Sequence, residues 1–249
     1  TANILRFRDE DGKPLLDKIL DVAGQKGTGK WSAIAAMDEN DPLTLITEAV
    51  YARLLSALYP ERIKAASLYS GKLKVESGKL SDNAQLSIED VRQALYAAKL
   101  ISYAQGFSLL RHASEHYGWD LDYGTIARIW RKGCIIRSVF LQKITEAYRK
   151  DPDLENLLFD DFFHTKIQEA LPAWRRVVAE GALSGVALPA MSSALNYFDG
   201  LRTLYSAANM IQAQRDYFGA HTYERTDRER GHFFHTNWTG EGGNTVSGT

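Results

Sequence analysis

The sequence is nearly free of cysteine, has almost no net charge and contains no long apolar run. Its single cysteine, Cys134, excludes an intrachain disulfide framework and is typical of a reducing compartment. The formal net charge of −1 lacks the basic excess of nucleic-acid-binding proteins, so nucleic acid is not expected as a partner. No run of about 18 apolar residues occurs, so no segment is expected to cross a membrane.

Alternation of apolar and polar residues with a period of two is also nearly absent, and helical periodicity occurs almost throughout. The predicted fold class is therefore all-α, in one large domain or two smaller ones. Prolines and glycines mark several helix ends at their usual positions. Besides a long helix from residue 88, the predicted helices span residues 14–24, 31–37, 44 to about 60, 125–133, 134–150, the segment after Asp160, 172–185 and 189–219.

The longest predicted helix follows Ser87, which opens the capping sequence SIED. From there to about Glu115, apolar or small side chains lie on almost every face of the helix. A helix that is apolar all round is typically buried, so this one is predicted to lie at the centre of the molecule. The polar, glycine-containing stretch before it, residues 71–86, is predicted to be a surface loop.

The pattern changes after about Thr222, where periodicity is lost and glycine and threonine become frequent. This tail still contains Phe233, Phe234 and Trp238, whereas disordered tails are usually poor in aromatic residues. We therefore expect the tail to pack on its own domain or on a second subunit. The predicted division is a helical domain over 1–221 and a tail over 222–249.

Residues Gly24–Lys30 satisfy the P-loop pattern G-x-x-x-x-G-K, but Trp31 follows where a P-loop requires Ser or Thr. A P-loop also follows a strand, whereas residues 14–23 predict an amphipathic helix, so a magnesium–nucleotide site is not expected. The loop still offers two lysines and Thr28 before a helix whose first amides favour anions. It is therefore either a phosphate-binding loop or an exposed glycine turn.

The segment Ile19–Trp31 resembles the signature of the decarboxylating 6-phosphogluconate dehydrogenase family. The resemblance extends from Thr1 to about Gly243 and implies the family's large all-helical domain with an extended C-terminal tail, without its N-terminal Rossmann domain. Further blocks resemble the family in the same order and at similar separations, namely LITEAVYARLLSAL, ALYAAKLISYAQGFSLLR, GCIIRSVFLQKI, MIQAQRDYFGAHTYER and FHTNWTG.

The resemblance implies that Lys26, Thr28 and Arg53 bind the phosphate and hydroxyl groups of 6-phosphogluconate. It implies that Arg215 and His221 reach the substrate site of the other subunit in a homodimer, on which the tail also packs. The family's cofactor is NADP, and the family uses no metal, so no metal site is expected.

The arginine of the first group, Arg53, lies on a helix face with small residues and is expected to face the core. A buried arginine requires an anionic partner. That partner is either the substrate phosphate, which suits the planar guanidinium, or an acid of the chain such as Glu48. A lone histidine such as His221 would be interpreted as a surface or core residue, and only the full match of RDYFGAH assigns it a binding role.

Two other features are interpreted as structural. His112, Glu115 and His116 satisfy H-x-x-E-H, a zinc-protease pattern. No third ligand is evident, so these residues are interpreted as an exposed helix end. Cys134 adjoins small and apolar residues and is predicted to be packed rather than reactive.

The residues expected to carry out the family's chemistry are missing from this sequence. No G-x-G-x-x-G loop occurs, and the family's catalytic lysine and glutamate belong to a block without a counterpart here. The first residues, TANILRF, resemble the end of a helix, so the chain is expected to be the C-terminal piece of a longer protein, with catalytic and cofactor-binding residues upstream of Thr1. One hypothesis is the substrate-binding portion of an oxidoreductase, cytoplasmic or, with an upstream signal, plastid. The other is a non-catalytic helical dimerisation or binding module.

Overall fold

The computed structural model describes residues 1–69, 86–131, 136 and 138–240. The predicted loop at 71–86 lies outside these residues except for Leu86, and Cys134 also lies outside them. Contacts within the chain form two compact units, Thr1–Phe198 and Asp199–Thr249. The division between these units precedes the predicted start of the tail.

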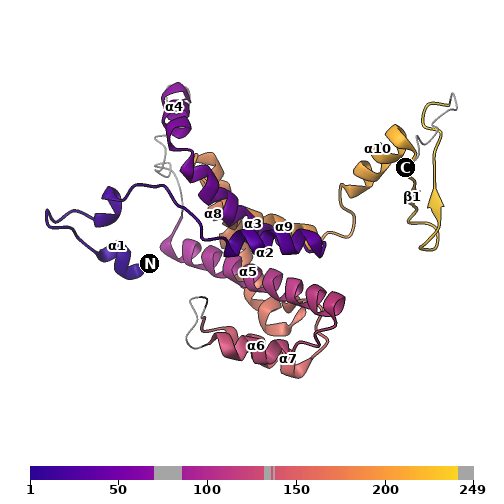
Figure 1. The fold of residues 1–249 in the computed structure, drawn as a ribbon, viewed down its shortest axis with the longest axis horizontal. Coiled ribbons are helices and arrows are strands. Elements are labelled where there is room, and N and C mark those ends of the chain that lie inside the picture. Colours follow the sequence, from indigo (N-terminus) through magenta and orange to yellow (C-terminus); the bar gives the residue numbers. More distant parts are fainter. Residues whose placement is uncertain (70–85, 132–135, 137, 241–249) are drawn as a thin grey trace. The chain divides into compact units, whose positions relative to one another are not determined.

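The all-α prediction is confirmed, because nearly all described regular structure is helical and the described strands form one short hairpin (Figure 1). None of the described helices combines the length and apolar composition needed to span a membrane. In chain order the elements are α1 (Ala2–Arg6), the 3-10 turn η1 (Leu15–Lys18), α2 (Thr28–Asp38), α3 (Thr44–Ala57), α4 (Tyr59–Tyr69), α5 (Ile88–Tyr117), α6 (Tyr123–Trp130), α7 (Leu141–Lys150), the 3-10 turn η2 (Leu157–Phe159), α8 (Asp161–Leu183), α9 (Pro189–Leu201), α10 (Ala208–Gly219), β1 (Tyr223–Glu224) and β2 (Phe233–Phe234).

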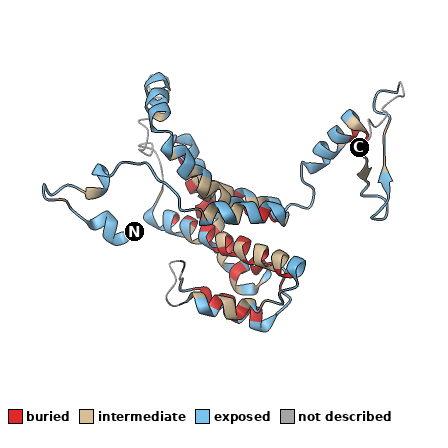
Figure 2. Cartoon of the chain, viewed as in Figure 1, coloured by how far each residue is buried: buried red, intermediate tan, exposed pale blue. Residues whose placement is uncertain are grey.

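Helix α5 forms the centre of the first unit, as the sequence predicts. Its capping box is present, with Asp90 N donating to the Ser87 hydroxyl at 3.0 Å and Ser87 N donating to the Asp90 carboxylate at 2.9 Å. Its buried side chains, which include Leu100 and Phe107, pack against α8, η2 and α3. Buried residues accordingly gather along the central helices in Figure 2, whereas the N-terminal segment is exposed. The first turns of α5 are not buried all round, since Ile88 is 92% exposed.

Helix α8 carries the largest fully buried side chain of the core, Trp174. The indole N–H of Trp174 donates to Met191 O at 3.2 Å and so connects α8 to α9. Pro172 lies inside α8, although the sequence predicts that a new helix begins there. Proline removes a backbone hydrogen bond and normally ends or kinks a helix. Apolar residues buried on both sides of it, such as Ile167 and Val177, stabilise the continuous helix against that cost.

Polar side chains on α5 hold the connection between α2 and α3. Gln105, which is fully buried, accepts from Leu45 N at 3.0 Å and donates to Thr44 Oγ1 at 2.8 Å. Ser108 donates to the buried carboxylate of Asp41 at 2.7 Å. These contacts join residues about 60 positions apart in sequence and fix the start of α3 against the central helix.

Other predicted helices also differ from the structure, and the one predicted over 134–150, for example, begins as α7 at Leu141. Within 14–24, only the short turn η1 is helical, and the chain is irregular from Ile19 to Lys26. Ile19 and Leu20 are exposed, so this segment lacks the packed apolar face that stabilises a short helix. The predicted helix at 189–219 is interrupted between Leu201 and Ala208, where α9 ends and α10 begins.

The second unit contains a hairpin after α10. Strands β1 and β2 are antiparallel, with Tyr223 opposite Phe234 and Glu224 opposite Phe233. The connecting residues include Gly231 with a φ of 85°, a conformation that favours glycine. Part of the predicted tail is therefore structured within its own unit.

Replacing Ser87 with Ala is expected to destabilise the chain by about 1 kcal/mol, because α5 loses the hydroxyl that caps its first turn. Urea unfolding followed by circular dichroism would measure this change. Ser102→Ala is a matched control, since Ser102 donates to Lys99 O within the same helix and does not cap a helix end. Equal destabilisation by the two substitutions would contradict the capping role.

Candidate functional site

The segment before the predicted phosphate loop is fixed to α3 and α4. Ala23 N donates to Ser56 Oγ at 2.9 Å, and Ser56 Oγ donates to Arg53 O at 2.7 Å. Arg62 Nη1 donates to Ser56 O at 3.0 Å, and the same guanidinium forms an ion pair with Asp21. The loop therefore begins from backbone that is anchored on α3.

Two glycines of the loop are required by its geometry. Gly27 is the N-cap of α2 with a φ of 104°, a left-handed conformation that favours glycine. A β-carbon at Gly27 would also lie 3.3 Å from the Trp31 ring. Gly29 lies so close to α3 that a β-carbon there would be 2.7 Å from Val50 Cγ2. One glycine thus permits the turn, and the other permits close packing of α2 on α3.

The start of α2 presents hydrogen-bond donors to solvent. Lys26, Thr28 and Lys30 are all exposed. Gly27 provides no side-chain cap, so the first amides of α2 have no partner from a capping side chain. Unpaired amides and the positive end of the helix dipole favour an anion at this position.

Arg53 is exposed, which contradicts the expectation that it faces the core. Helix α3 has no fully buried residue, so a stripe of small residues does not identify a core face there. Arg53 Nη2 donates to Gly24 O, which brings the guanidinium to the loop. Within the described part of the chain, Arg53 forms no ion pair with a carboxylate, so the alternative pair with Glu48 is not observed.

The other two predicted residues belong to the second unit. Arg215 is exposed on α10, and its Nη1 donates to Gln212 Oε1 at 2.9 Å. His221 is also exposed, and its imidazole packs so closely on Gly219 that a β-carbon there would be 3.0 Å away. The structure thus brings Arg53 to the loop that holds Lys26 and Thr28, while it describes Arg215 and His221 only within their own unit.

The backbone that carries Arg215 and His221 is organised by Asp216, a residue that the sequence analysis missed. Its carboxylate is fully buried. It accepts hydrogen bonds from Thr222 N at 3.0 Å, Thr236 N at 3.0 Å and Trp238 Nε1 at 2.8 Å, and it lies 2.9 Å from His235 Nδ1. Burial raises the pKa of Asp216, but these four partners outweigh it and lower the pKa to about 2. An acid on an otherwise ordinary helix gives no local sign of such burial.

The histidines of the H-x-x-E-H pattern are not simply an exposed helix end. His112 Nδ1 lies 2.8 Å from Asp41 Oδ2, and His116 Nδ1 lies 2.8 Å from Glu39 Oε2. Both carboxylates belong to the α2–α3 connection, so the histidines extend the polar contact between α5 and that connection. Among the described residues, no three His, Cys, Asp or Glu side chains form a group that could hold a metal ion.

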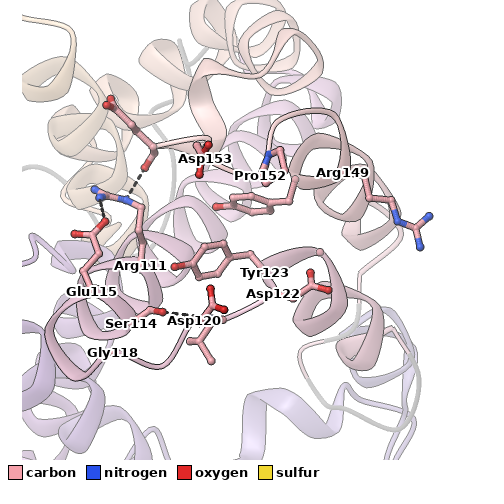
Figure 3. Close-up of a pocket in the computed structure, with 14 residues that line it drawn as sticks. Arg111, Ser114, Glu115, Gly118, Asp120, Asp122, Tyr123, Arg149, Pro152 and Asp153 are labelled. Carbon is pink, nitrogen blue, oxygen red and sulfur yellow. Dashed lines mark hydrogen bonds and ion pairs between the residues drawn. The ribbon is translucent and has the colours of Figure 1, made fainter.

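A large cavity of about 1010 Å³ lies beside the C-terminal end of α5, in the first unit (Figure 3). None of the five predicted site residues lines it. Its lining combines charged and polar groups with apolar surface and comes from α5, α6, α7 and their connections: Arg111, Ser114, Glu115, Gly118, Asp120, Leu121, Asp122, Tyr123, Gly124, Tyr148, Arg149, Pro152, Asp153 and Glu155.

Comparison with known proteins relates this structure to one family. The family described as "6-phosphogluconate dehydrogenase, C-terminal domain" matches residues 1–238. The decarboxylating 6-phosphogluconate dehydrogenase of Rattus norvegicus is 55% identical over 247 residues, which cover 99% of this chain and 50% of that protein. The corresponding protein of Aggregatibacter actinomycetemcomitans is 53% identical over 249 residues, which cover 100% of this chain and 51% of that protein.

A solved structure is also similar to this chain. Plasmodium falciparum 6-phosphogluconate dehydrogenase, described in its apo form and in complexes with its cofactor NADP+ and its substrate 6-phosphogluconate, matches with a TM-score of 0.84 and 41% identity. The match covers 95% of this chain and 50% of that one. The chain therefore spans about half the length of the relatives that it matches.

The depressed pKa of Asp216 predicts an acid-sensitive second unit. An unfolded aspartate has a pKa of about 3.9, so the charged Asp216 contributes stability above about pH 4 that is lost as the pH falls toward about 2. Amide hydrogen exchange of residues 222–238 should therefore accelerate, relative to its intrinsic rate, across this window. In the Asp216→Asn variant, the amides of residues 222–238 should exchange fast even at about pH 5. The asparagine side chain would place an N–H donor against the buried N–H groups that donate to Asp216.

Asp227→Asn is the matched control. Asp227 forms an ion pair with Arg225, and both side chains are largely exposed, so this substitution should leave exchange protection nearly unchanged. Normal protection in the Asp216→Asn variant would show that Asp216 does not organise the unit.

Proposed function

The chain belongs to the 6-phosphogluconate dehydrogenase family, and from that premise we propose that it is the substrate-binding portion of an NADP-dependent oxidoreductase. The complete protein would oxidise and decarboxylate 6-phosphogluconate to ribulose 5-phosphate in the pentose phosphate pathway. In support, the relatives are named decarboxylating 6-phosphogluconate dehydrogenases, and the solved Plasmodium protein is described with NADP+ and 6-phosphogluconate.

The observation that carries this proposal is the position of Arg53 beside the glycine loop. Arg53 donates to Gly24 O, and the loop that follows exposes Lys26 and Thr28 at the uncapped start of α2. A dianionic phosphate placed there would meet two cationic side chains, a hydroxyl and the first helix amides. Charge-assisted bonds of this kind are stronger than bonds between neutral groups. We assign phosphate binding to these residues.

The sequence offers no residues to hold NADP in a dinucleotide loop, since it lacks G-x-G-x-x-G. NADP, when bound, accepts a hydride from the substrate. We assign its binding mainly to residues outside this chain, together with the catalytic acid and base. Within the proposal, the role of this chain is to bind and orient the phosphorylated substrate.

We further propose that the complete protein is a homodimer in which Arg215 and His221 complete the substrate site of the other subunit. Helix α10 exposes Met210, Ile211 and Phe218, the last of which is 82% exposed. Large apolar side chains exposed together on one helix are typical of an interface. The interior of α5, in contrast, is already buried by its own unit and gives no separate support for a dimer.

The alternative of a non-catalytic helical module is not favoured, because Lys26, Thr28, Arg53, Arg215 and His221 all remain exposed to a ligand. A cytoplasmic location is part of the proposal, in keeping with the single cysteine.

In the full-length protein, Arg53→Ala or Arg215→Ala should weaken 6-phosphogluconate binding by roughly ten- to a hundredfold, the size of one charge-assisted hydrogen bond. NADP binding should barely change. Arg53→Lys should restore binding only in part, because an ammonium lacks the planar N–H groups with which a guanidinium binds two phosphate oxygens at once. Isothermal titration calorimetry with each ligand would measure these effects. Arg92→Ala is a matched control, since Arg92 is exposed on α5 and pairs with Glu89; unchanged substrate affinity in Arg53→Ala would reject the phosphate role.

Mixing subunits tests the shared site directly. A heterodimer of an Arg53→Ala subunit and an Arg215→Ala subunit would place both lesions in one active site and leave the other intact. The mixed species should therefore recover about half of the wild-type turnover, as expected for two independent sites. Absence of recovery would show that Arg215 serves its own subunit, while leaving its contact with phosphate open.

A further inference from the structure

The cavity at the end of α5 is built separately from the proposed substrate loop. The last turns of α5, the connection to α6, the facing ends of α6 and α7 and the turn after α7 line its volume of about 1010 Å³, which is open to solvent on one side (Figure 3). This volume is at the upper end of the range for small-molecule sites. The described residues that line it are all in the first unit.

The lining carries an excess of negative charge. Of its five carboxylates, those of Asp120, Asp153 and Glu155 have no hydrogen-bond or ion-pair partner among the described residues. Arg111 is neutralised by Glu115, with Nη1 and Oε1 2.7 Å apart. The cavity therefore offers three free carboxylates and favours a cationic ligand.

Two tyrosines form the wall between α6 and α7. The rings of Tyr123 and Tyr148 have centroids 5.2 Å apart at an angle of 46°. Tyr148 is only 6% exposed, yet its hydroxyl has no hydrogen-bond partner among the described residues. Burial raises the pKa of Tyr148, so the hydroxyl stays neutral and can both donate and accept. Arg149, the other cation of the lining, directs its guanidinium away from Tyr123 (Figure 3).

The carboxylates do not converge on one point. No group of three acidic, histidine or cysteine side chains in the described chain could hold a metal ion. A ligand that meets several of these carboxylates must therefore distribute its positive charge along its length.

We propose that this cavity binds a linear polyamine, in which ammonium groups are separated by methylene chains. The ammonium groups pair with Asp120, Asp153 and Glu155, and one donates to the Tyr148 hydroxyl. The methylene chain lies against the tyrosine rings, whose faces also attract cations. This site is independent of the proposed substrate loop and of the oxidoreductase activity.

Titration calorimetry of the chain with spermidine tests the proposal. One molecule should bind per chain, with an affinity that falls as sodium chloride rises. Tyr148→Phe keeps the ring and removes the unpaired hydroxyl, so it should weaken binding by about tenfold. The double substitution Asp120→Asn and Asp153→Asn changes exposed side chains and should weaken binding by at least about tenfold.

Glu169→Gln is the matched control, because Glu169 is an exposed acid on α8 that pairs with Lys166 outside the cavity. It should leave spermidine affinity within about twofold, as expected for a distant surface charge. The proposal is overturned if millimolar spermidine produces no saturable heat, or if Glu169→Gln weakens binding as much as the cavity variants. It is also overturned if magnesium displaces spermidine more strongly than sodium at equal ionic strength, since that would indicate a divalent-ion site.

Discussion

The contact between α5 and the α2–α3 connection is the constraint on which the candidate site depends. Asp41 is buried there with its Oδ2 close to Ser108 and His112, while its Oδ1 has no hydrogen-bond partner among the described residues. A buried carboxylate is costly unless it is hydrogen-bonded. These polar contacts, with those of Gln105, set α2 and α3 in one position on the central helix. The glycine turn and Arg53 are placed by the same two helices.

Each unit uses a polar anchor to hold backbone next to exposed cationic side chains. In the first unit, Ser56 and Arg62 hold the segment that leads into the glycine loop. In the second unit, the buried carboxylate of Asp216 gathers the hairpin and the end of α10. Asp216 is fully buried and Ser56 and Arg62 are half-buried, whereas Arg53 and Arg215 are exposed on the backbone that these residues hold. Such preorganisation lowers the entropy that a ligand must overcome on binding.

Sequence reasoning succeeded where local signals and burial agree. The capping box at Ser87 and the small, apolar residues after it predicted α5, and the glycines predicted the loop between Gly24 and α2. It failed where a distant partner decides the outcome. Pro172 lies inside α8 because packed residues on both sides stabilise that helix. Residues 14–24 form only the short turn η1, because apolar side chains such as Ile19 and Leu20 are not buried by any described partner.

The sequence by itself determined the helical class, the position of the central helix, the glycine loop and the family resemblance, because periodicity, capping and motifs are encoded by residues close together in the chain. Only the tertiary structure decided that Arg53 is exposed, that Asp216 is buried and that His112 meets Asp41. Burial and pairing of a charged side chain depend on which distant segment covers it. Local sequence does not specify that segment, and the fold selects it by burying apolar surface and satisfying buried polar groups together.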